Sequence, residues 1–368
     1  MFEEFHKKLA FGFMRLPLLE NGEIDIKQIK KMVDTFIENG FNYFDTAHGY
    51  MDEKSEPTLK ECLVDRYPRN AFLITDKLTD SYIHSAEDIR PFFEKQLKTV
   101  GVKYFDNYLM HAVGSRNYDK YQRCNAFEIV SELKKEGKIR HIGISFHDTA
   151  EFLDNVLTEH PEIEIVQLQF NYIDYDNPAV QSKACYDVCV KHGKPCLVME
   201  PVKGGSLVKI PAEAQKVFDN LNNGSNASYA IRFAAGFDNI KMVLSGMSTL
   251  AQVQDNVAYM KDFVPLSEEE LTTIGQVKNI IKGKHMIPCT SCRYCTAGCP
   301  KHIKIPEMFS CMNAQEAYND WNSAFYYNIL VKTSSKASEC IKCGQCERVC
   351  PQHLKIRDLL EKVADTFE

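Results

Sequence analysis

Short apolar runs alternate with amphipathic stretches from the start of the chain to about Gly283. Apolar runs bounded by turn residues predict β-strands. The chain has eight of them, LAFGFM (9–14), NYFDTA (42–47), FLITDKL (72–78), FDNYLMH (105–111), HIGISF (141–146), IVQLQFN (165–171), CLVMEP (196–201) and KMVLSG (241–246). The stretches between them predict helices. Two examples are IDIKQIKKMVDTFIENG, which ends at Gly40, and SAEDIRPFFEKQLKTVG, which opens on a Ser-x-x-Asp capping pattern and ends at Gly101.

Eight strands that alternate with helices are typical of an α/β protein, and they predict a (β/α)8 TIM barrel. A doubly wound open sheet is the alternative. It usually has fewer strands, and it favours a G-x-G-x-x-G motif after the first strand, which this sequence lacks. We therefore expect a barrel over residues 1–283.

The composition changes after Gly283. Residues 284–357 lose the alternation of strands and helices and hold nine of the fourteen cysteines. We expect a second, smaller domain over residues 284–368. Its last stretch, LKIRDLLEKVADTF (354–367), has the spacing of an amphipathic helix that packs back on the protein.

Composition and charge exclude several classes of function. The 368 residues carry a net charge of −6, which argues against a nucleic-acid partner. No uncharged apolar run approaches the roughly 18 residues of a transmembrane helix, so we expect no membrane partner. The N-terminal MFEEFHKKLAFGF does not have the pattern of a secretory signal. We therefore expect a cytoplasmic protein, in which closely spaced cysteines favour metal binding over disulfides.

Eight cysteines form two runs with the spacing C-x2-C-x2-C-x3-C-P, which are Cys289, Cys292, Cys295 and Cys299, then Cys340, Cys343, Cys346 and Cys350. In two-cluster ferredoxins, three cysteines of such a run bind one [4Fe–4S] cluster and the fourth binds the other cluster. This rule predicts one cluster on Cys289, Cys292, Cys295 and Cys350, and a second on Cys340, Cys343, Cys346 and Cys299. A pair of zinc sites is the alternative, but zinc ribbons favour two C-x2-C pairs. Residues 285–357 thus resemble a bacterial-type two-cluster ferredoxin.

The 40 residues between Cys299 and Cys340 form a longer gap than compact ferredoxins have. The gap contains Trp321 and the aromatic stretch AFYYN (324–328), and we expect it to pack on the barrel or to receive a partner. The remaining cysteines have the pattern of core or helical residues; they are Cys62, Cys124, Cys185, Cys189, Cys196 and Cys311.

Four residues suited to proton transfer lie at the ends of predicted strands. Asp45 ends the second strand and Tyr50 follows it, while Lys77 ends the third strand and His111 ends the fourth. The C-terminal ends of barrel strands converge on one mouth, where active sites lie. We therefore expect these four side chains to form a catalytic site.

The DTAHGY segment, the strand-ending Lys77 and the strand-ending LMH resemble the catalytic tetrad of the aldo-keto reductases. FGFMRLP, QLQFNY and VLSGMST are also similar to that family, and the resemblance covers about residues 5–282. It implies a TIM barrel, a nicotinamide cofactor (NADP or NAD) and a small-molecule carbonyl or alcohol substrate.

The tetrad suits the chemistry of such a reaction. A hydride that reaches a carbonyl carbon leaves charge on the oxygen, and we expect Tyr50 to donate the proton. Lys77 should lower the pKa of Tyr50, which is about 10 in a free phenol. Asp45 should keep Lys77 charged, and His111 should hydrogen-bond the carbonyl oxygen.

The resemblance also implies cofactor contacts. Ser145 and Gln167 match the residues that hold the nicotinamide carboxamide, and Asn171 is close by. Asp255 and Asn256 match the acid and the amide on the adenine side. The segments that follow the last two strands favour phosphate binding through backbone N–H groups; these are Gly204, Gly205, Gly246, Met247 and Ser248.

Three features depart from the family pattern. Phe146 stands where the family usually has Asn, and Met199 replaces the aromatic residue that stacks on the nicotinamide. Gly246 and Gln252 replace the Lys and Arg that grip the 2′-phosphate of NADP, which weakens the expected preference for NADP over NAD. The loss of the stacking aromatic leaves a flavin as an alternative cofactor.

A hydride carries two electrons, whereas each cluster passes one at a time, so a link between them needs a converter such as flavin. Three functions follow. The first is an oxidoreductase that interconverts a carbonyl and an alcohol, with electrons relayed through the clusters to a one-electron partner protein. The second is a self-sufficient NAD(P)H carbonyl reductase with structural clusters. The third is a non-catalytic electron-transfer protein, against which the complete tetrad argues.

Overall fold

The computed structural model describes residues 4–115, 117–178, 180–283, 287, 289, 294–318, 321–350 and 354–368. Eight parallel strands close into a barrel in which each strand pairs with its sequence neighbours and the last pairs with the first. The strands are β1 (Leu9–Gly12), β2 (Tyr43–Asp45), β3 (Leu73–Leu78), β4 (Phe105–Val113), β5 (Ile139–Phe146), β6 (Ile165–Gln169), β7 (Cys196–Met199) and β8 (Ile240–Ser245). The predicted (β/α)8 barrel is therefore confirmed, and the open sheet is excluded.

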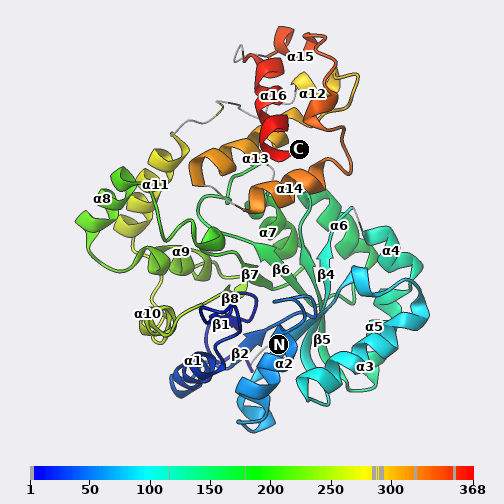
Figure 1. Ribbon diagram of the computed structural model, residues 1–368, viewed down its shortest axis with the longest axis vertical. Helices are drawn as coiled ribbons and strands as arrows, with labels where there is room; N and C mark the ends of the chain where they lie inside the picture. Colours follow the sequence, from blue (N-terminus) through cyan, green and yellow to red (C-terminus); the bar gives the residue numbers. More distant parts are fainter. Residues whose placement is uncertain are drawn as a thin grey trace.

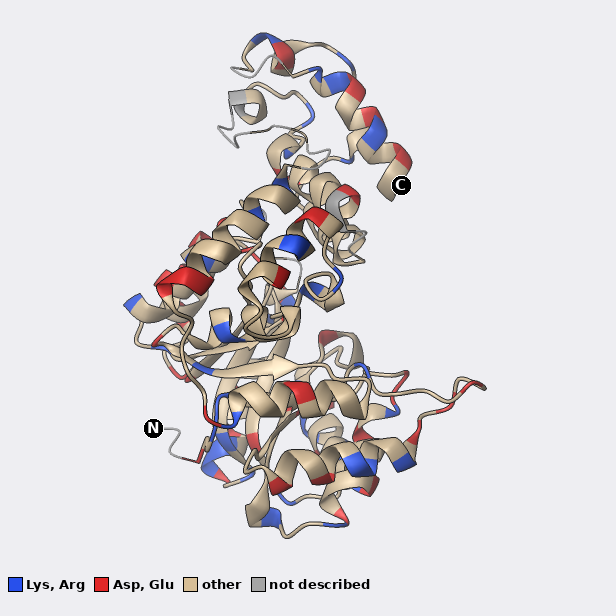
Figure 2. Cartoon of the chain, turned by 90° about the vertical axis from the view of Figure 1, so that its left-hand side faces the viewer, with Lys and Arg blue, Asp and Glu red and all other residues tan. Residues whose placement is uncertain are grey.

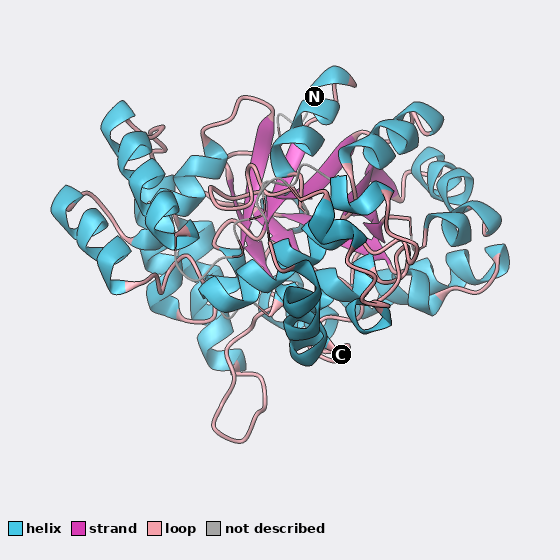
Figure 3. Cartoon of the chain, turned by 90° about the horizontal axis from the view of Figure 1, so that it is seen from above, coloured by secondary structure: helices cyan, strands magenta, loops and turns pink. Residues whose placement is uncertain are grey.

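Helices surround the strands on all sides, as the view from above shows (Figure 3). One helix or more follows each strand; these are α1 (Ile26–Glu38), α2 (Ser55–Leu59), α3 (Ile89–Val100), α4 (Tyr118–Arg123), α5 (Ala126–Lys135), α6 (Ala150–Glu159), α7 (Ser182–Lys191), α8 (Ala212–Leu221), α9 (Asn226–Ala235), α10 (Leu250–Met260) and α11 (Glu268–Lys282). Within the described residues, no helix is both long enough and apolar enough to cross a membrane.

Local sequence signals set the ends of the helices. The Asp25 side chain accepts a hydrogen bond from the backbone N–H of Gln28 at 3.0 Å, so α1 begins one residue later. The predicted capping pattern at Ser85 and Asp88 is present, although a short 3-10 turn precedes α3. Gly101 ends α3 with φ of 80°, a left-handed conformation that glycine adopts without strain.

The interior of the barrel is packed with side chains rather than open. Seven side chains from alternating strand positions form this inner core, which are Ala10, Tyr43, Leu73, Ile165, Leu197, Met242 and Leu244. The Tyr43 hydroxyl contacts Thr75 Oγ1 at 2.5 Å and accepts a hydrogen bond from Asn107 at 3.1 Å, so it is satisfied although it is fully buried. Asp45 and Ser245, at the C-terminal ends of β2 and β8, line a cavity at that end of the barrel.

The C-terminal part of the chain is helical, with α12 (Tyr294–Ala297), α13 (Ile305–Tyr318), α14 (Asn322–Leu330), α15 (Gln345–Arg348) and α16 (Ile356–Phe367). It has its own apolar core, to which α16 contributes Ile356, Leu360 and Val363, so the C-terminal helix packs back as predicted. In Figure 1, α13 and α14 lie between the barrel and the rest of this part. Both signs of charge are interspersed along both parts of the chain (Figure 2).

Candidate active site

The four predicted catalytic residues lie together at the barrel mouth. Lys77, on β3, donates hydrogen bonds to Asp45 Oδ1, at the end of β2, and to the backbone oxygen of Thr46, both at 2.7 Å. The Lys77 Nζ atom lies 4.8 Å from the centre of the Tyr50 ring. The rings of Tyr50 and His111 meet edge to face with their centres 5.8 Å apart. The barrel thus brings together four side chains from three consecutive strand ends.

Burial and charge act against each other at this site. Burial lowers the pKa of Lys77, but the neighbouring Asp45 and Tyr50 outweigh it, so the pKa lies above its ordinary value and the ammonium persists. Burial raises the pKa of Asp45, and Lys77 opposes that shift. Burial also raises the pKa of Tyr50, while Lys77 lowers it by a smaller amount. Lys77 therefore lowers the pKa of Tyr50 as expected, but the pKa as a whole stays above its ordinary value because desolvation of the phenol outweighs the ammonium beside it.

A buried polar network behind β3 holds the backbone on both sides of Lys77. The Asp76 carboxylate accepts hydrogen bonds from the Lys77 N–H at 2.8 Å and from Gln96 Nε2 at 3.1 Å. Gln96 Nε2 also lies 3.1 Å from the Lys77 backbone oxygen and 3.1 Å from a carboxylate oxygen of Glu56. Sequence reasoning missed this network, because its members are far apart in the chain and none stands in a motif.

A cavity of about 650 Å³ opens at the barrel mouth, a size within the range of ligand sites. Asp45, Tyr50 and His111 form part of its wall. The predicted cofactor contacts that line it are Ser145, Gln167, Gly204, Gly205, Gly246, Met247, Ser248, Gln252, Asp255 and Asn256. They extend from the tetrad to the N-terminal end of α10, so the cavity follows the path that the sequence predicted for a dinucleotide.

Asn171 is the predicted contact that does not line this cavity. Its side-chain amide donates to Asp174 at 2.8 Å and to the backbone oxygen of Glu200 at 3.0 Å. Asp174 in turn pairs with the buried Lys203 at 2.9 Å. Asn171 therefore holds the loop after β7 in place, and its position next to the strand end was a misleading signal.

The loop between β8 and α10 is already hydrogen-bonded within the protein. The Ser248 N–H donates to Gln252 Oε1 at 2.6 Å, and Asn256 donates to Ser245 Oγ at 2.7 Å. Asp255 accepts a hydrogen bond from Ser225 at 2.7 Å. Of the described residues that line the cavity, Arg15 is the one Lys or Arg. Gln252, Asp255 and Asn256 therefore bring two amides and an acid but no positive charge to the adenine end of the predicted path, while Arg15 stands beside Gly246 at the start of the loop.

The segment between the two cysteine runs packs on the barrel, as one of its two expected roles required, and its contact with Arg15 is the part that sequence reasoning missed. The Arg15 guanidinium pairs with Glu200 at 3.0 Å and lies 5.1 Å from the Trp321 ring, and both partners line the cavity. Arg15 is part of the FGFMRLP segment, whereas Trp321 comes from the C-terminal part. Their meeting depends on the packing of the two parts, which no local pattern indicates.

The cysteines of the second predicted cluster surround a small cavity. Cys299, Cys340, Cys343 and Cys346 line it, together with apolar side chains that include Ile303 and Leu360. In the described part of the chain, no three His, Cys, Asp or Glu side chains lie close enough to hold a single metal ion. The four cysteines instead stand around a common space, which is the arrangement that a cubane needs, because its own atoms separate the ligands.

Three cysteines of the first predicted cluster are described. Cys295 is part of the C-terminal apolar core, and Cys289 and Cys350 pack against that core. Cys292 lies outside the described residues. Among the other cysteines, Cys185 and Cys189 are buried, as the predicted core role requires.

The fold and the mouth define a TIM-barrel oxidoreductase with a C-terminal iron–sulfur domain. A family model described as the aldo/keto reductase family matches residues 8–279, and the chain belongs to this family. A second model, described as a 4Fe–4S dicluster domain, matches residues 288–354. The predicted fusion of the two is therefore confirmed.

Curated relatives and solved structures agree with this assignment. The chain is 24% identical over 309 residues to the NADH-specific methylglyoxal reductase of Escherichia coli (strain K12), covering 71% of this chain and 91% of that protein. It is 28% identical over 191 residues to the glyoxal reductase of Bacillus subtilis (strain 168), covering 52% of this chain and 62% of that protein.

A similar fold is found in an aldo-keto reductase from Klebsiella pneumoniae in complex with NADPH, with a TM-score of 0.60 and 20% identity over 74% of this chain and 90% of that one. The holo form of an aldo-keto reductase from Bacillus halodurans also has a TM-score of 0.60, with 23% identity over 74% of this chain and 92% of that one.

Proposed function

We propose that the barrel interconverts a carbonyl and an alcohol with a nicotinamide cofactor. The observation that carries this proposal is that Asp45, Tyr50 and His111 line one cavity of about 650 Å³, with Lys77 hydrogen-bonded to Asp45 beside it. A nicotinamide bound there supplies or accepts the hydride. Tyr50 donates the proton to the developing alkoxide, and His111 orients the carbonyl oxygen. The Asp45–Lys77 ion pair keeps a positive charge beside the phenol, so that it can give up its proton.

The donors in the cavity fit the cofactor and favour NADH over NADPH. Ser145 and Gln167 lie near the tetrad, where an amide would bind. A 2′-phosphate would lie at the adenine end of the cavity. There the Ser248 N–H already donates a hydrogen bond to Gln252, and Asp255 adds negative charge. One curated relative is itself described as NADH-specific.

We further propose that the C-terminal domain holds two [4Fe–4S] clusters, with the ligand sets Cys289, Cys292, Cys295 and Cys350, and Cys340, Cys343, Cys346 and Cys299. Such clusters carry single electrons when bound. A second candidate function is an exchange of electrons between these clusters and the barrel site through a bound flavin. The observation that favours it is that α14, on the cluster domain, forms part of the wall of the barrel cavity.

One anaerobic experiment separates the two functions. The protein is purified without oxygen, its visible spectrum is recorded, and NADH and NADPH are added separately, each with and without benzaldehyde. Consumption of NADH that depends on benzaldehyde, with an unchanged cluster absorbance, supports the self-contained reductase. Bleaching of the cluster absorbance by NADH alone supports the electron exchange. Absence of both reactions would refute the proposed function.

Tyr50→Phe provides the matched control. It removes one hydroxyl and keeps the ring, so the cavity and the cluster domain should be preserved. Reduction of benzaldehyde should be lost while the iron content per chain stays at the wild-type value. Wild-type activity in this variant would show that Tyr50 is not the proton donor.

A further inference from the structure

Helix α14 turns one face toward the barrel cavity. Trp321, which directly precedes α14, lines the cavity, as do Asn322, Phe325 and Tyr326. Residues four positions apart lie on the same face of a helix, so Trp321 lies above Phe325 and Asn322 above Tyr326, and these two neighbouring rows both line the cavity. That surface closes the cavity on the side away from the barrel floor, and three of its four side chains are aromatic.

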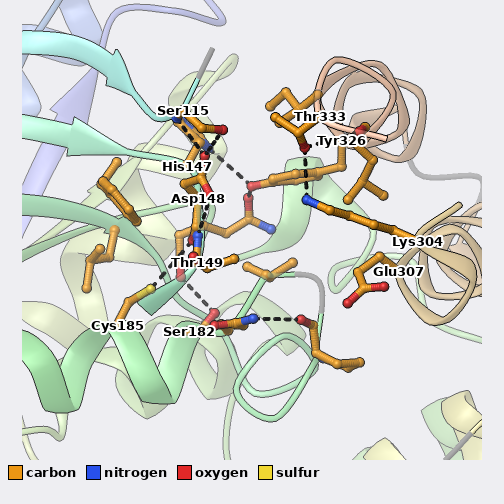
Figure 4. A pocket seen from close by; sticks show the side chains of 18 residues that line it. Ser115, His147, Asp148, Thr149, Ser182, Cys185, Lys304, Glu307, Tyr326 and Thr333 are labelled. Carbon is orange, nitrogen blue, oxygen red and sulfur yellow. Dashed lines mark hydrogen bonds between the residues drawn. The ribbon is translucent and has the colours of Figure 1, made fainter. Parts of the chain in front are cut away.

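This face is fixed to the barrel by specific contacts. The Tyr326 hydroxyl donates a hydrogen bond to Gln169 Oε1, and it lies 3.2 Å from His147 Nδ1. The His147 ring also meets the Phe325 ring edge to face, with centres 5.8 Å apart. The Gln169 side-chain amide in turn donates a hydrogen bond to the Asp174 carboxylate at 2.8 Å. Figure 4 shows Tyr326 reaching toward His147 beside a smaller cavity, which both residues also line. Hydrogen bonds and ring contacts with barrel residues therefore hold α14 in place over the cavity.

Trp321 lies at the rim of the cavity, and half of its surface is exposed. The Arg15 guanidinium lies 5.1 Å from its ring, which is a cation–π distance. The backbone of the loop after β7 also approaches it closely, because a Cβ added at Gly204 would lie 2.6 Å from Trp321 Nε1. A large aromatic side chain held at an open rim by such contacts is typical of a surface that binds ligands.

We propose that α14 is the substrate-selecting wall of the barrel site, with Phe325, beside His147, selecting carbonyl compounds that carry a flat, uncharged aromatic group. The proposal rests on the proposed function, since the carbonyl must reach Tyr50 and His111 at the other side of the same cavity. Arg15 does not favour an anionic substrate, because its charge is already paired with Glu200. An aromatic group gains from stacked or edge-to-face contacts with the wall, which a small aliphatic group cannot make.

The kinetic test compares benzaldehyde with propanal in the complete, cluster-loaded protein. The wild-type protein should have the higher kcat/KM for benzaldehyde. Phe325→Ala should raise the KM for benzaldehyde by about tenfold, because one aromatic contact is lost, and should leave kcat unchanged. Its kinetics with propanal should stay within about twofold of wild type. Phe325→Leu, which keeps the apolar volume and removes the ring, should show the same selectivity change if Phe325→Ala fails to fold.

The matched control is Asn328→Ala, since Asn328 is exposed on the same helix and does not line the cavity. It should leave both substrates unaffected. An equal loss for benzaldehyde and propanal in the Phe325 variants, or no loss for either, would overturn the proposal.

A binding experiment without turnover separates this proposal from the proposed function. Trp321 is the one tryptophan in the chain, so its fluorescence reports on the cavity rim. Benzyl alcohol should change this fluorescence in the wild-type protein, with binding about tenfold weaker in Phe325→Ala. Binding that depends on Phe325 in a protein that reduces no carbonyl would support the wall and refute the reaction. Reduction of benzaldehyde with binding independent of Phe325 would support the reaction and refute the wall.

Discussion

Replacing Lys77 by Met should destabilise the barrel strongly, because it leaves a buried carboxylate unpaired. The two side chains of the Asp45–Lys77 pair are 5% and 1% exposed, and their charged atoms lie 2.7 Å apart. After the substitution, Asp45 keeps one weak hydrogen bond, from Gln167 at 3.2 Å. Removing one partner of a buried pair costs about 3–5 kcal/mol. For a domain of this size, that corresponds to a fall of about 6–20 °C in Tm.

The double variant Lys77→Met with Asp45→Leu tests whether the unpaired charge is the cause. Its Tm should recover most of the loss, since apolar residues of similar volume replace a buried ion pair at little cost. Neither variant should reduce benzaldehyde with NADH, because the ammonium beside Tyr50 is gone. The assays are thermal unfolding followed by circular dichroism under nitrogen and the rate of NADH consumption. A double variant as unstable as Lys77→Met would refute the reasoning, as would a wild-type Tm in Lys77→Met.

The loss of stability in Lys77→Met should also depend on pH, because this variant keeps the Asp45 carboxyl. Burial already raises the pKa of Asp45 in the presence of Lys77, and loss of Lys77 removes an opposing effect. A carboxyl whose pKa is higher in the folded state stabilises the fold at low pH and loses that contribution as the pH rises through the folded pKa. The deficit of Lys77→Met should therefore be smaller at about pH 5 than at about pH 8. A deficit that is constant over this range would show that Asp45 is not its source.

Three further predictions concern the phenol, the cofactor and the clusters. Because burial holds the pKa of Tyr50 above its ordinary value, the rate of carbonyl reduction should not decline with rising pH until about pH 10; a decline near neutrality would contradict the burial argument. Gln252→Arg should lower the KM for NADPH by about 10- to 100-fold, which corresponds to one charge-assisted hydrogen bond to the phosphate. An unchanged ratio of the KM values for NADPH and NADH would show that the 2′-phosphate does not bind beside residue 252. Cys350→Ala should remove the signal of the cluster assigned to the first cysteine run in electron paramagnetic resonance spectra. Cys311→Ala, at a buried cysteine of the same domain, should keep both clusters. Loss of only the other cluster in Cys350→Ala would refute the crossed ligand sets.

The sequence predicted the barrel and the tetrad because both depend on local signals. Each strand is a short apolar run, and Asp45, Lys77 and His111 each lie at or near a strand end, where the barrel topology alone brings them together. The cysteine spacing is also local. The boundary near Gly283 stays a prediction, as do the roles assigned to individual side chains.

Contacts between distant segments were not predictable in the same way. Asn171 follows a strand end as the other site residues do, but Asp174 and the loop after β7 hold its amide away from the cavity. The pKa of Tyr50 depends on how much of the protein covers the phenol, and no motif records that. Trp321 lies in the segment that was expected to pack on the barrel, but no pattern indicated Arg15 as its partner, because their contact exists only where the cluster domain sits on the barrel mouth.

Helix α14 contacts both parts of the chain, because one of its faces packs in the core of the C-terminal domain and another lines the barrel cavity. Tyr327 points into the apolar core of the cluster domain, which also contains Cys295 and Cys346, while Phe325 lines the barrel cavity. We expect cluster ligation to stabilise that core, since metal-bound domains of this size gain much of their folding free energy from the metal. The aldo/keto reductase match ends at residue 279, before α14 begins. The proposed reaction at Tyr50 thus lies in the part of the chain that the family model matches, whereas the proposed substrate wall lies beyond it. We expect chains with the same barrel but a different C-terminal part to select different carbonyl compounds.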